Sequence, residues 1–238
     1  MFFVKKEEIL IKKTVKKLAA ILMASVLCFQ GSGVVYAAED LTTTEESPYM
    51  DVSEEDWYFD GVCYMKNNAL MTGVGTGEYF MPGEYLQRQD VALILARQYK
   101  NTIDNNLNLN QSNGAYYTDA VNWVKKKEIM NGYNPENFGV GDAITRQDFA
   151  VTLYNYLYKN YGICNLDVVL EPVLNKYSDV SEVRPYAWDA MDEMVRCGII
   201  EGTGTDVKML DPNGTVTRGM AAVMLRRYME VFNHIFRN

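Results

Sequence analysis

Three arginines lie in a five-residue pattern that recurs along the chain, and each stands where it can bind an anion. If the residue before the arginine caps a helix, the arginine falls in the first turn and its side chain leans back past the helix end. Unpaired backbone N–H groups there already favour anions, and a guanidinium can grip a carboxylate with two parallel hydrogen bonds. An apolar stretch with helical spacing follows each copy of the pattern, which reads LQRQD at 86–90, ITRQD at 144–148 and VTRGM at 216–220. The pattern therefore predicts carboxylate-binding roles for Arg88, Arg146 and Arg218.

The second copy has the most favourable sequence for this role. Thr145 is a good helix cap, and Asp148 stands three residues later, where it could complete a capping box. A cation in the first turn of a helix opposes the helix dipole, at a cost of up to ~1 kcal/mol. Because this unfavourable residue is repeated in every copy, it suggests a use, and Arg146 is the favoured site.

The other two copies are weaker. Gln87 is a poorer cap beside Arg88, and Met220 replaces the acid after Arg218, which predicts a degraded third site. One alternative stays open for all three arginines: each could instead form an ion pair with an acid of its own fold, such as Asp51 or Asp179.

Other landmarks recur in register with the arginines, which indicates three repeated units. An aromatic residue opens each unit, a glycine follows sixteen residues later, and a large apolar residue precedes each arginine by eight positions. The opening residues are Trp57, Tyr116 and Tyr186, the glycines are Gly73, Gly132 and Gly202, and the apolar residues are Phe80, Phe138 and Leu210.

Each unit reads as helix, loop, helix, with a short extended piece near the apolar landmark. The first helical stretch carries an apolar stripe that ends just before the glycine, and the glycine is expected to turn the chain with positive φ. The second stretch begins at the arginine. The first stripes are Val62, Met65 and Leu70, then Val121, Val124 and Ile129, then Met191, Met194 and Ile199; the second are Val91, Ala92, Leu95 and Tyr99, then Phe149, Ala150, Leu153 and Leu157, then Ala221, Ala222, Leu225 and Met229.

The start of the chain has the layout of a secretory signal peptide. Six lysines precede an apolar stretch too short for a permanent membrane span, and small residues suit cleavage after Ala37 or Ala38. A lipidated Cys28 is a weaker alternative. The expected organisation is a signal peptide at 1–38, a flexible leader at 39–47, repeats at 48–100, 115–162 and 176–238, and linkers at 101–114 and 163–175.

Charge and composition exclude several classes of function. The whole chain has 23 Lys and Arg against 31 Asp and Glu; without the first 38 residues, which hold six lysines and two glutamates, 17 and 29 remain, a net charge near −12. Such a charge argues against nucleic acid or an anionic membrane surface as a partner. The single histidine, His234, is not accompanied by a serine or cysteine nucleophile motif. The sequence also contains no phosphate-binding loop and no metal-ligand spacing. We therefore expect neither enzymatic activity nor a cofactor. The three cysteines that would remain are expected to be buried apolar residues.

Two further groups of side chains have a functional and a structural interpretation. Trp57 is best placed to present its ring to a sugar, whereas core packing is favoured for Trp123 and Trp188. The acids of residues 51–56 could hold calcium, but the segment lacks the Asp-Gly pattern of a calcium loop. A solvated acidic start to the first helix is the favoured interpretation.

Several motifs together resemble the S-layer homology domain family. They are the Asp-Val pairs at 51–52 and 179–180, the aromatic residue before each first helix, Gly-Ile-Ile-Glu-Gly at 198–202, and Ile-Thr-Arg-Gln-Asp at 144–148. The resemblance covers about residues 48–238.

This resemblance implies a mainly α fold, with three helix-loop-helix repeats in a pseudo-threefold arrangement and ligand grooves between them. It also implies non-covalent anchoring, on the surface of a Gram-positive type of bacterium, to secondary cell wall polymer or a peptidoglycan-linked glycan, including anionic or pyruvylated sugars. On this analogy the binding residues are Arg88, Arg146, Arg218, Asp51, Asp179, Trp57, Gly73, Gly132 and Gly202. The alternative is a structural envelope component that binds other proteins and no glycan.

Overall fold

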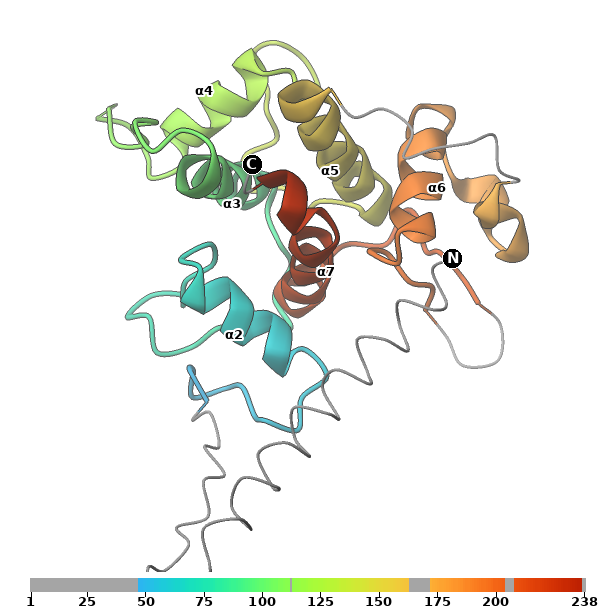
Figure 1. Ribbon diagram of the computed structural model, residues 1–238, viewed down its shortest axis with the longest axis horizontal. Helices are drawn as coiled ribbons and strands as arrows, with labels where there is room; N and C mark the ends of the chain where they lie inside the picture. Colours follow the sequence, from blue (N-terminus) through green and yellow to red (C-terminus); the bar gives the residue numbers. More distant parts are fainter. Residues whose placement is uncertain (1–46, 112, 163–171, 204–207, 237–238) are drawn as a thin grey trace, which may run out of the picture. The chain divides into compact units, whose positions relative to one another are not determined.

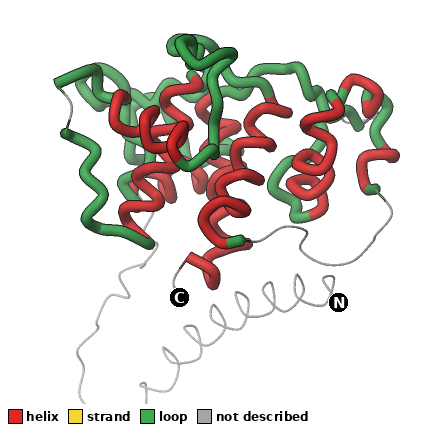
Figure 2. Tube along the Cα trace, turned by 90° about the horizontal axis from the view of Figure 1, so that it is seen from above, coloured by secondary structure: helices red, strands yellow, loops and turns green. Residues whose placement is uncertain are grey.

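The computed structural model describes residues 47–111, 113–162, 172–203 and 208–236, together with the side chains up to residue 233. Within these ranges the fold is mainly α, as expected, and contains no strand longer than an isolated bridge. Figure 2 shows the helices side by side, with the connecting loops gathered toward one face. The α-helices are α2 (Phe59–Asn67), α3 (Arg88–Thr102), α4 (Thr118–Lys126), α5 (Arg146–Tyr161), α6 (Trp188–Arg196) and α7 (Arg218–Phe236), and the 3-10 helices are η1 (Val173–Lys176), η2 (Val180–Glu182) and η3 (Pro185–Ala187).

The first helix of each repeat packs against the second helix of the preceding repeat. Thus α4 lies on α3 and α6 lies on α5, and α2 lies on α7, which closes the three repeats into a ring (Figure 1). Gly61 makes the last pairing possible, because a Cβ there would lie 2.9 Å from the backbone of Ala222. The predicted pseudo-threefold arrangement is confirmed, and its third junction joins the first repeat to the last.

A ring of backbone hydrogen bonds lies where the three repeats meet. The Leu86 N–H donates to the Val216 carbonyl at 2.8 Å, Val216 to Ile144 at 3.0 Å, and Ile144 to Leu86 at 3.0 Å. All three side chains are fully buried. These residues occupy the same place in the recurring pattern, two before each arginine, so the pattern itself builds the centre of the fold.

The predicted apolar stripes form the core. Every residue of the six stripes is buried except Tyr99, which is half-buried against the core. Burying apolar side chains on one face of a short helix is the main source of its stability. Trp123 is buried and Trp188 is half-buried against the same core, as expected.

The chain reverses direction after each first helix at a different residue from the one predicted. Ala69, Glu128 and Gly198 have positive φ, at 53°, 55° and 71°. The expectation of positive φ at Gly73, Gly132 and Gly202 was wrong, since those glycines lie outside the left-handed region. The residue after each turn, Leu70, Ile129 or Ile199, is buried at once, and this burial offsets the strain of the turn.

The connections differ in part from the expected linkers. α3 continues to Thr102, and Leu107 and Leu109 pack against the core, so residues 101–114 are better anchored than their composition suggested. In the second connection, Leu174 is buried, and the Asp192 carboxylate accepts hydrogen bonds from the Val173 and Leu174 N–H groups. The predicted signal peptide, most of the predicted leader, Cys28, Cys164 and the apolar residues between 163 and 171 lie outside the described residues.

Two cysteines, Cys63 and Cys197, lie in the described part of the chain. Cys63 is buried, and burial raises the pKa of the Cys197 thiol to about 12. Cys63 fits the predicted role of a buried apolar residue, whereas Cys197 is half-buried and its thiol donates a hydrogen bond to Glu193 at 3.3 Å. Among the described helices, none combines the length and apolar character that crossing a membrane would require.

Candidate functional site

Each of the three arginines is the first residue of its helix, as the recurring pattern predicts. Thr145 caps α5 by accepting a hydrogen bond from the Asp148 N–H at 3.2 Å, and Thr217 does the same for the Met220 N–H at 3.3 Å. Gln87 makes no side-chain cap, in line with its expected weakness. The expected capping box is only half formed, because the Asp148 carboxylate is directed to another repeat.

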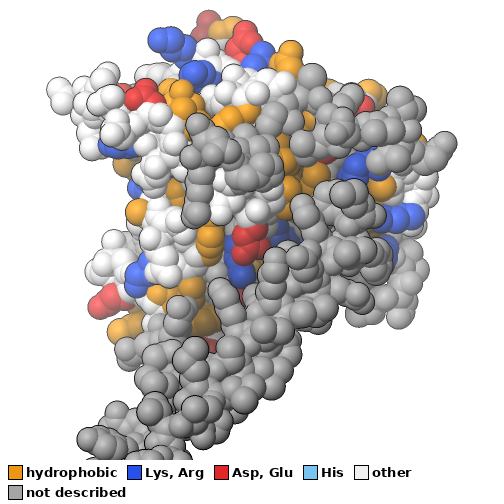
Figure 3. Space-filling view, in the orientation of Figure 1, with side chains coloured by type: hydrophobic (Ala, Val, Ile, Leu, Met, Phe, Trp, Pro, Cys, Tyr) orange, Lys and Arg blue, Asp and Glu red, His pale blue; other side chains and the backbone are white. Residues whose placement is uncertain are grey.

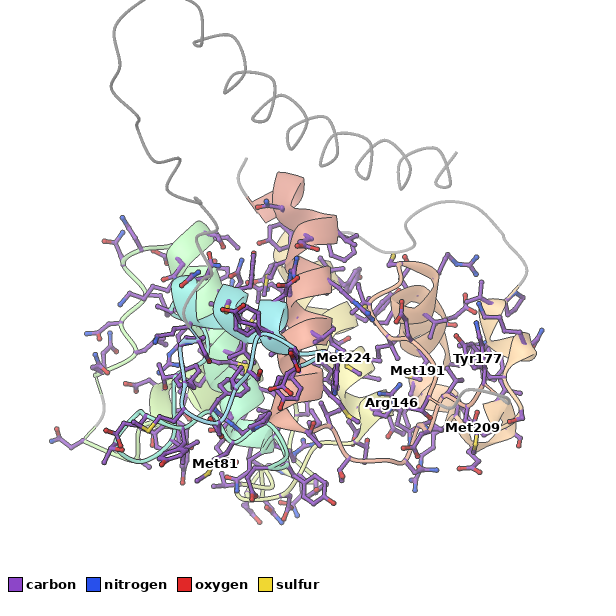
Figure 4. The ribbon with its side chains drawn as sticks, turned by 90° about the horizontal axis from the view of Figure 1, so that it is seen from below. Met81, Arg146, Tyr177, Met191, Met209 and Met224 are labelled. Atoms are coloured by element: carbon purple, nitrogen blue, oxygen red, sulfur yellow. The ribbon has the colours of Figure 1, made fainter. Side chains whose placement is uncertain are left out.

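Arg146 reaches across from the second repeat and holds the loop of the third. Its Nε donates to the Leu210 carbonyl at 2.7 Å, and its Nη2 donates to the Glu201 carbonyl at 2.8 Å. Figure 4 shows Arg146 beside the labelled Tyr177, Met191 and Met209 of the third repeat. The two carbonyls flank the variable loop, so one guanidinium fixes both of its ends.

The other two arginines make the same pair of contacts with the next repeat around the ring. Arg88 donates to the Phe138 carbonyl at 3.0 Å and to the Asn131 carbonyl at 2.7 Å. Arg218 donates to the Phe80 carbonyl at 2.8 Å and to the Thr72 carbonyl at 2.9 Å, which joins the last repeat to the first. The pattern therefore supplies one backbone clamp at each of the three junctions.

The three guanidinium groups differ in exposure, in an order that the sequence did not indicate. Arg146 is 2% exposed and Arg88 is 6% exposed, whereas Arg218 is only partly buried. Burial lowers the pKa of Arg146, although the charges of Asp211 and Asp179 act to raise it. Burial likewise lowers the pKa of Arg218, although the charge of Asp90 acts to raise it. Arg218, expected to mark the weakest site, is thus the most accessible of the three.

Asp51 and Asp179 do not form ion pairs with the arginines; they bind backbone. The Asp179 carboxylate accepts hydrogen bonds from the Leu210 N–H at 2.8 Å and the Asp211 N–H at 2.7 Å. Asp51 accepts two from the Phe80 and Met81 N–H groups, both at 2.7 Å. Asp179 thereby holds the N–H group of Leu210, whose carbonyl is bound by Arg146. In the same way, Asp51 holds the N–H group of Phe80, whose carbonyl is bound by Arg218.

The two acids of the recurring pattern, Asp90 and Asp148, contact side chains of the neighbouring repeats. Asp148 lies 3.9 Å from Arg88 of the first repeat and accepts a 2.7 Å hydrogen bond from the Tyr186 hydroxyl of the third, so it contacts all three repeats. Asp90 accepts a 2.6 Å hydrogen bond from the Tyr116 hydroxyl, and it also acts electrostatically on Arg218.

Sequence reasoning missed these acid–tyrosine pairs, although the sequence contained a signal for them. Where the acid is replaced by Met220, the opening tyrosine is replaced by Trp57. The acid that acts electrostatically on Arg218 is Asp90, so the replacement of an acid by Met220 leaves that interaction in place.

The three landmark glycines are required by close approach of backbone. A Cβ on Gly73 would lie 2.3 Å from the Gly77 carbonyl oxygen, and one on Gly132 would lie 2.2 Å from that of Asn137. A Cβ on Gly202 would lie 2.6 Å from the ring of Tyr177. These glycines shape the loop walls beside the arginines and offer no side chain to a ligand.

Trp57 is 65% exposed and packs edge-on against Tyr58, with ring centroids 5.2 Å apart. The acids near it form no metal site: the described residues contain no cluster of three His, Cys, Asp or Glu side chains able to hold an ion. Asp56 instead accepts a hydrogen bond from the Ser53 N–H at 2.7 Å, which agrees with an acidic start to the first helix. On the face drawn in Figure 3, basic and acidic side chains are interspersed.

The fold and the clamps define a class of protein, a closed module of three helical repeats. Residues 111–150 and 176–222 match the model of the S-layer homology domain. These two segments cover most of the second and third repeats, and we assign the first repeat from its identical clamp and helix pairing. Two segments of the chain, in its second and third repeats, are thus similar to the S-layer homology domain.

Two relatives are similar over much of the chain. The "S-layer protein" of Bacillus thuringiensis subsp. finitimus is 25% identical over 185 residues, which is 75% of this chain and 21% of that protein. The "Surface-layer 125 kDa protein" of Lysinibacillus sphaericus is 25% identical over 153 residues, which is 63% of this chain and 12% of that protein. The chain thus spans less than a quarter of the length of either relative.

Proposed function

We propose that the protein is a non-covalent anchor that attaches to the bacterial cell wall through secondary cell wall polymer bound between its repeats. The match of two segments to the S-layer homology domain and the names of the two surface-layer relatives support a role at the cell surface. The observation that carries the proposal is the repetition of one arginine clamp at three junctions of a closed ring. Several weak sites on one rigid body can bind together to a polymer that presents many copies of its ligand.

We assign the principal site to the surroundings of Arg218, since this residue is the least buried of the three arginines. The Arg218 Nε and Nη2 atoms hold the Phe80 and Thr72 carbonyls, and its guanidinium carbon lies 4.7 Å from the centre of the Phe80 ring. Asp51 and Asp90 stand near it and offset part of its charge. This balance favours a ligand with one carboxylate on an otherwise neutral sugar over a polyanion.

The test uses the chain without its predicted signal peptide, residues 39–238, which we call the mature chain. It is sedimented with purified cell walls, before and after chemical removal of the secondary polymer. The proposal expects binding to intact walls and its loss on stripped peptidoglycan. Equal retention on stripped walls would refute polymer binding.

The assignment to Arg218 is tested by comparing three variants, Arg88→Lys, Arg146→Lys and Arg218→Lys, at equal folded fraction measured by circular dichroism. Lysine keeps the charge, but its single ammonium group cannot hold two carbonyls, as Nε and Nη2 of the arginine do, and also present donors to a ligand. The largest loss of wall binding is expected for Arg218→Lys. If Arg88→Lys or Arg146→Lys lost more wall binding than Arg218→Lys, the assignment to Arg218 would be wrong, and the more affected arginine would mark the principal site.

A second role has weaker support, in which the module packs against other envelope proteins and binds no glycan. The loops of the first repeat expose Met50, Tyr79, Met81 and Tyr85, which is the kind of surface that protein partners cover. Wall binding that survives polymer removal but is abolished by protease treatment of the walls would favour this role.

A further inference from the structure

A cleft that none of the three arginine clamps lines lies at the junction of the first and last repeats, and its lining includes Trp57, which the family resemblance places among the polymer-binding residues. It has a volume of about 460 Å³ and lies between the start of α2 and the middle of α7. This volume falls within the usual range of ~300–1,000 Å³ for small-molecule sites. Its lining consists of Glu54, Asp56, Trp57, Phe59, Asp60, Gly61, Val223, Arg226, Arg227 and Glu230.

The cleft combines an exposed aromatic ring with fixed polar side chains. Trp57 is 65% exposed, and its edge-on contact with Tyr58 orients the indole. Arg226 lies between two carboxylates, 2.7 Å from Asp60 and 2.9 Å from Glu230. These ion pairs hold the polar groups in place on either side of the α2–α7 contact.

The charges of the cleft exclude the anionic ligand proposed for the arginine clamps. Four carboxylates line it, and the charge of Arg227 is balanced by Glu201 outside the lining, at 3.0 Å. Arg226 offsets one carboxylate, so the cleft carries a net negative charge. A negative site beside an exposed indole is suited to a cation, because the face of a tryptophan ring attracts ammonium groups.

We propose that this cleft binds a hexosamine with a free ammonium group, as part of a wall glycan whose amino sugars are not acetylated. The apolar face of the sugar ring lies on Trp57, and the ammonium group is directed to the carboxylates, chiefly Glu54, for which the described residues provide no ion pair. The inference does not depend on the arginine clamps. It gives the module two contacts with the wall that differ in the charge of their ligand.

The test is a titration of the mature chain at pH 6 with fully deacetylated chitotriose, followed by the indole N–H signal of Trp57 in NMR spectra. Binding is expected to shift this signal and to weaken at high salt. N,N′,N″-triacetylchitotriose at the same concentrations is expected to leave it unchanged. An equal response to the acetylated sugar would overturn the role of the ammonium group, and an equal affinity for N-acetyl-lysine amide would overturn the role of the sugar ring.

Variants separate the cleft from effects on folding. Trp57→Ala is expected to abolish binding, which is then monitored through the sugar signals, and the exposure of Trp57 leaves the fold intact. Glu54→Gln is expected to weaken binding by about two- to fivefold, the range for an exposed ion pair. Glu55→Gln, an exposed neighbour outside the lining, is the matched control and should bind as the wild type does. Equal affinities of the Glu54→Gln and Glu55→Gln variants would refute the proposal.

Discussion

Replacing Arg146 by lysine tests the clamp that joins the second repeat to the third. The guanidinium holds two carbonyls at 2.7 and 2.8 Å, and the side chain is only 2% exposed. A lysine keeps the charge but presents one compact ammonium group, which cannot reach both carbonyls in the same geometry. At least one charge-assisted hydrogen bond is lost, and each contributes ~1.5–3 kcal/mol. We expect Arg146→Lys to lower the free energy of unfolding by about 2 kcal/mol.

The assay is urea denaturation of the mature chain, followed by circular dichroism in the absence of any wall component. Arg184→Lys is the matched control, because Arg184 is exposed and stands at the same junction. Its effect should stay within ~0.5 kcal/mol. If Arg146→Lys changed stability no more than this control, the clamp would not hold the loop, and a loss of wall binding in that variant could be assigned to the ligand alone.

Three further changes have defined outcomes. Asp179→Ala removes two hydrogen bonds to the Leu210 and Asp211 N–H groups and should destabilise the protein by about 2–4 kcal/mol in urea; a neutral result would contradict the role given to this acid. Ala69→Gly relieves positive φ at an exposed position and should raise the free energy of unfolding by ~0.5–1 kcal/mol; a lower urea midpoint would refute the strain. Burial and the hydrogen bonds to Asp90 and Asp148 raise the pKa of Tyr116 and Tyr186 to about 12, so the folded state holds these protons more tightly than the unfolded chain does. Stability should therefore fall between about pH 10 and 12, less steeply in Tyr186→Phe, and an unchanged slope would count against the pairing.

The helices and the core follow from local sequence. The apolar stripes of the six helices are short-range patterns, and burial of one helix face is what such patterns specify. Thr145 was recognised as a cap for the same reason, since its partner is three residues away.

The clamps could not be predicted, because they join residues far apart in sequence. Arg218 and Thr72 are 146 positions apart, and nothing near either residue indicates the other. The interpretation of Arg88, Arg146 and Arg218 as ligand-binding residues rested on their place in the helix and stays a prediction, whereas the structure shows each of them holding the next repeat.

The glycines show a further limit of sequence reasoning. A repeated glycine signals a backbone constraint, but the sequence does not say whether the constraint is positive φ or close approach. At Gly73 and Gly132 the constraint is the opposite wall of the loop, whereas the left-handed turn is made by Ala69 and Glu128, two residues that local rules place elsewhere.

The measurement that tests anchoring most directly is calorimetric titration of the mature chain with secondary polymer released from purified walls. We expect saturable binding that weakens in the Arg218→Lys variant at equal folded fraction, and no binding of peptidoglycan fragments freed of the polymer. Absence of binding to the polymer by a folded wild-type chain would contradict the proposed function.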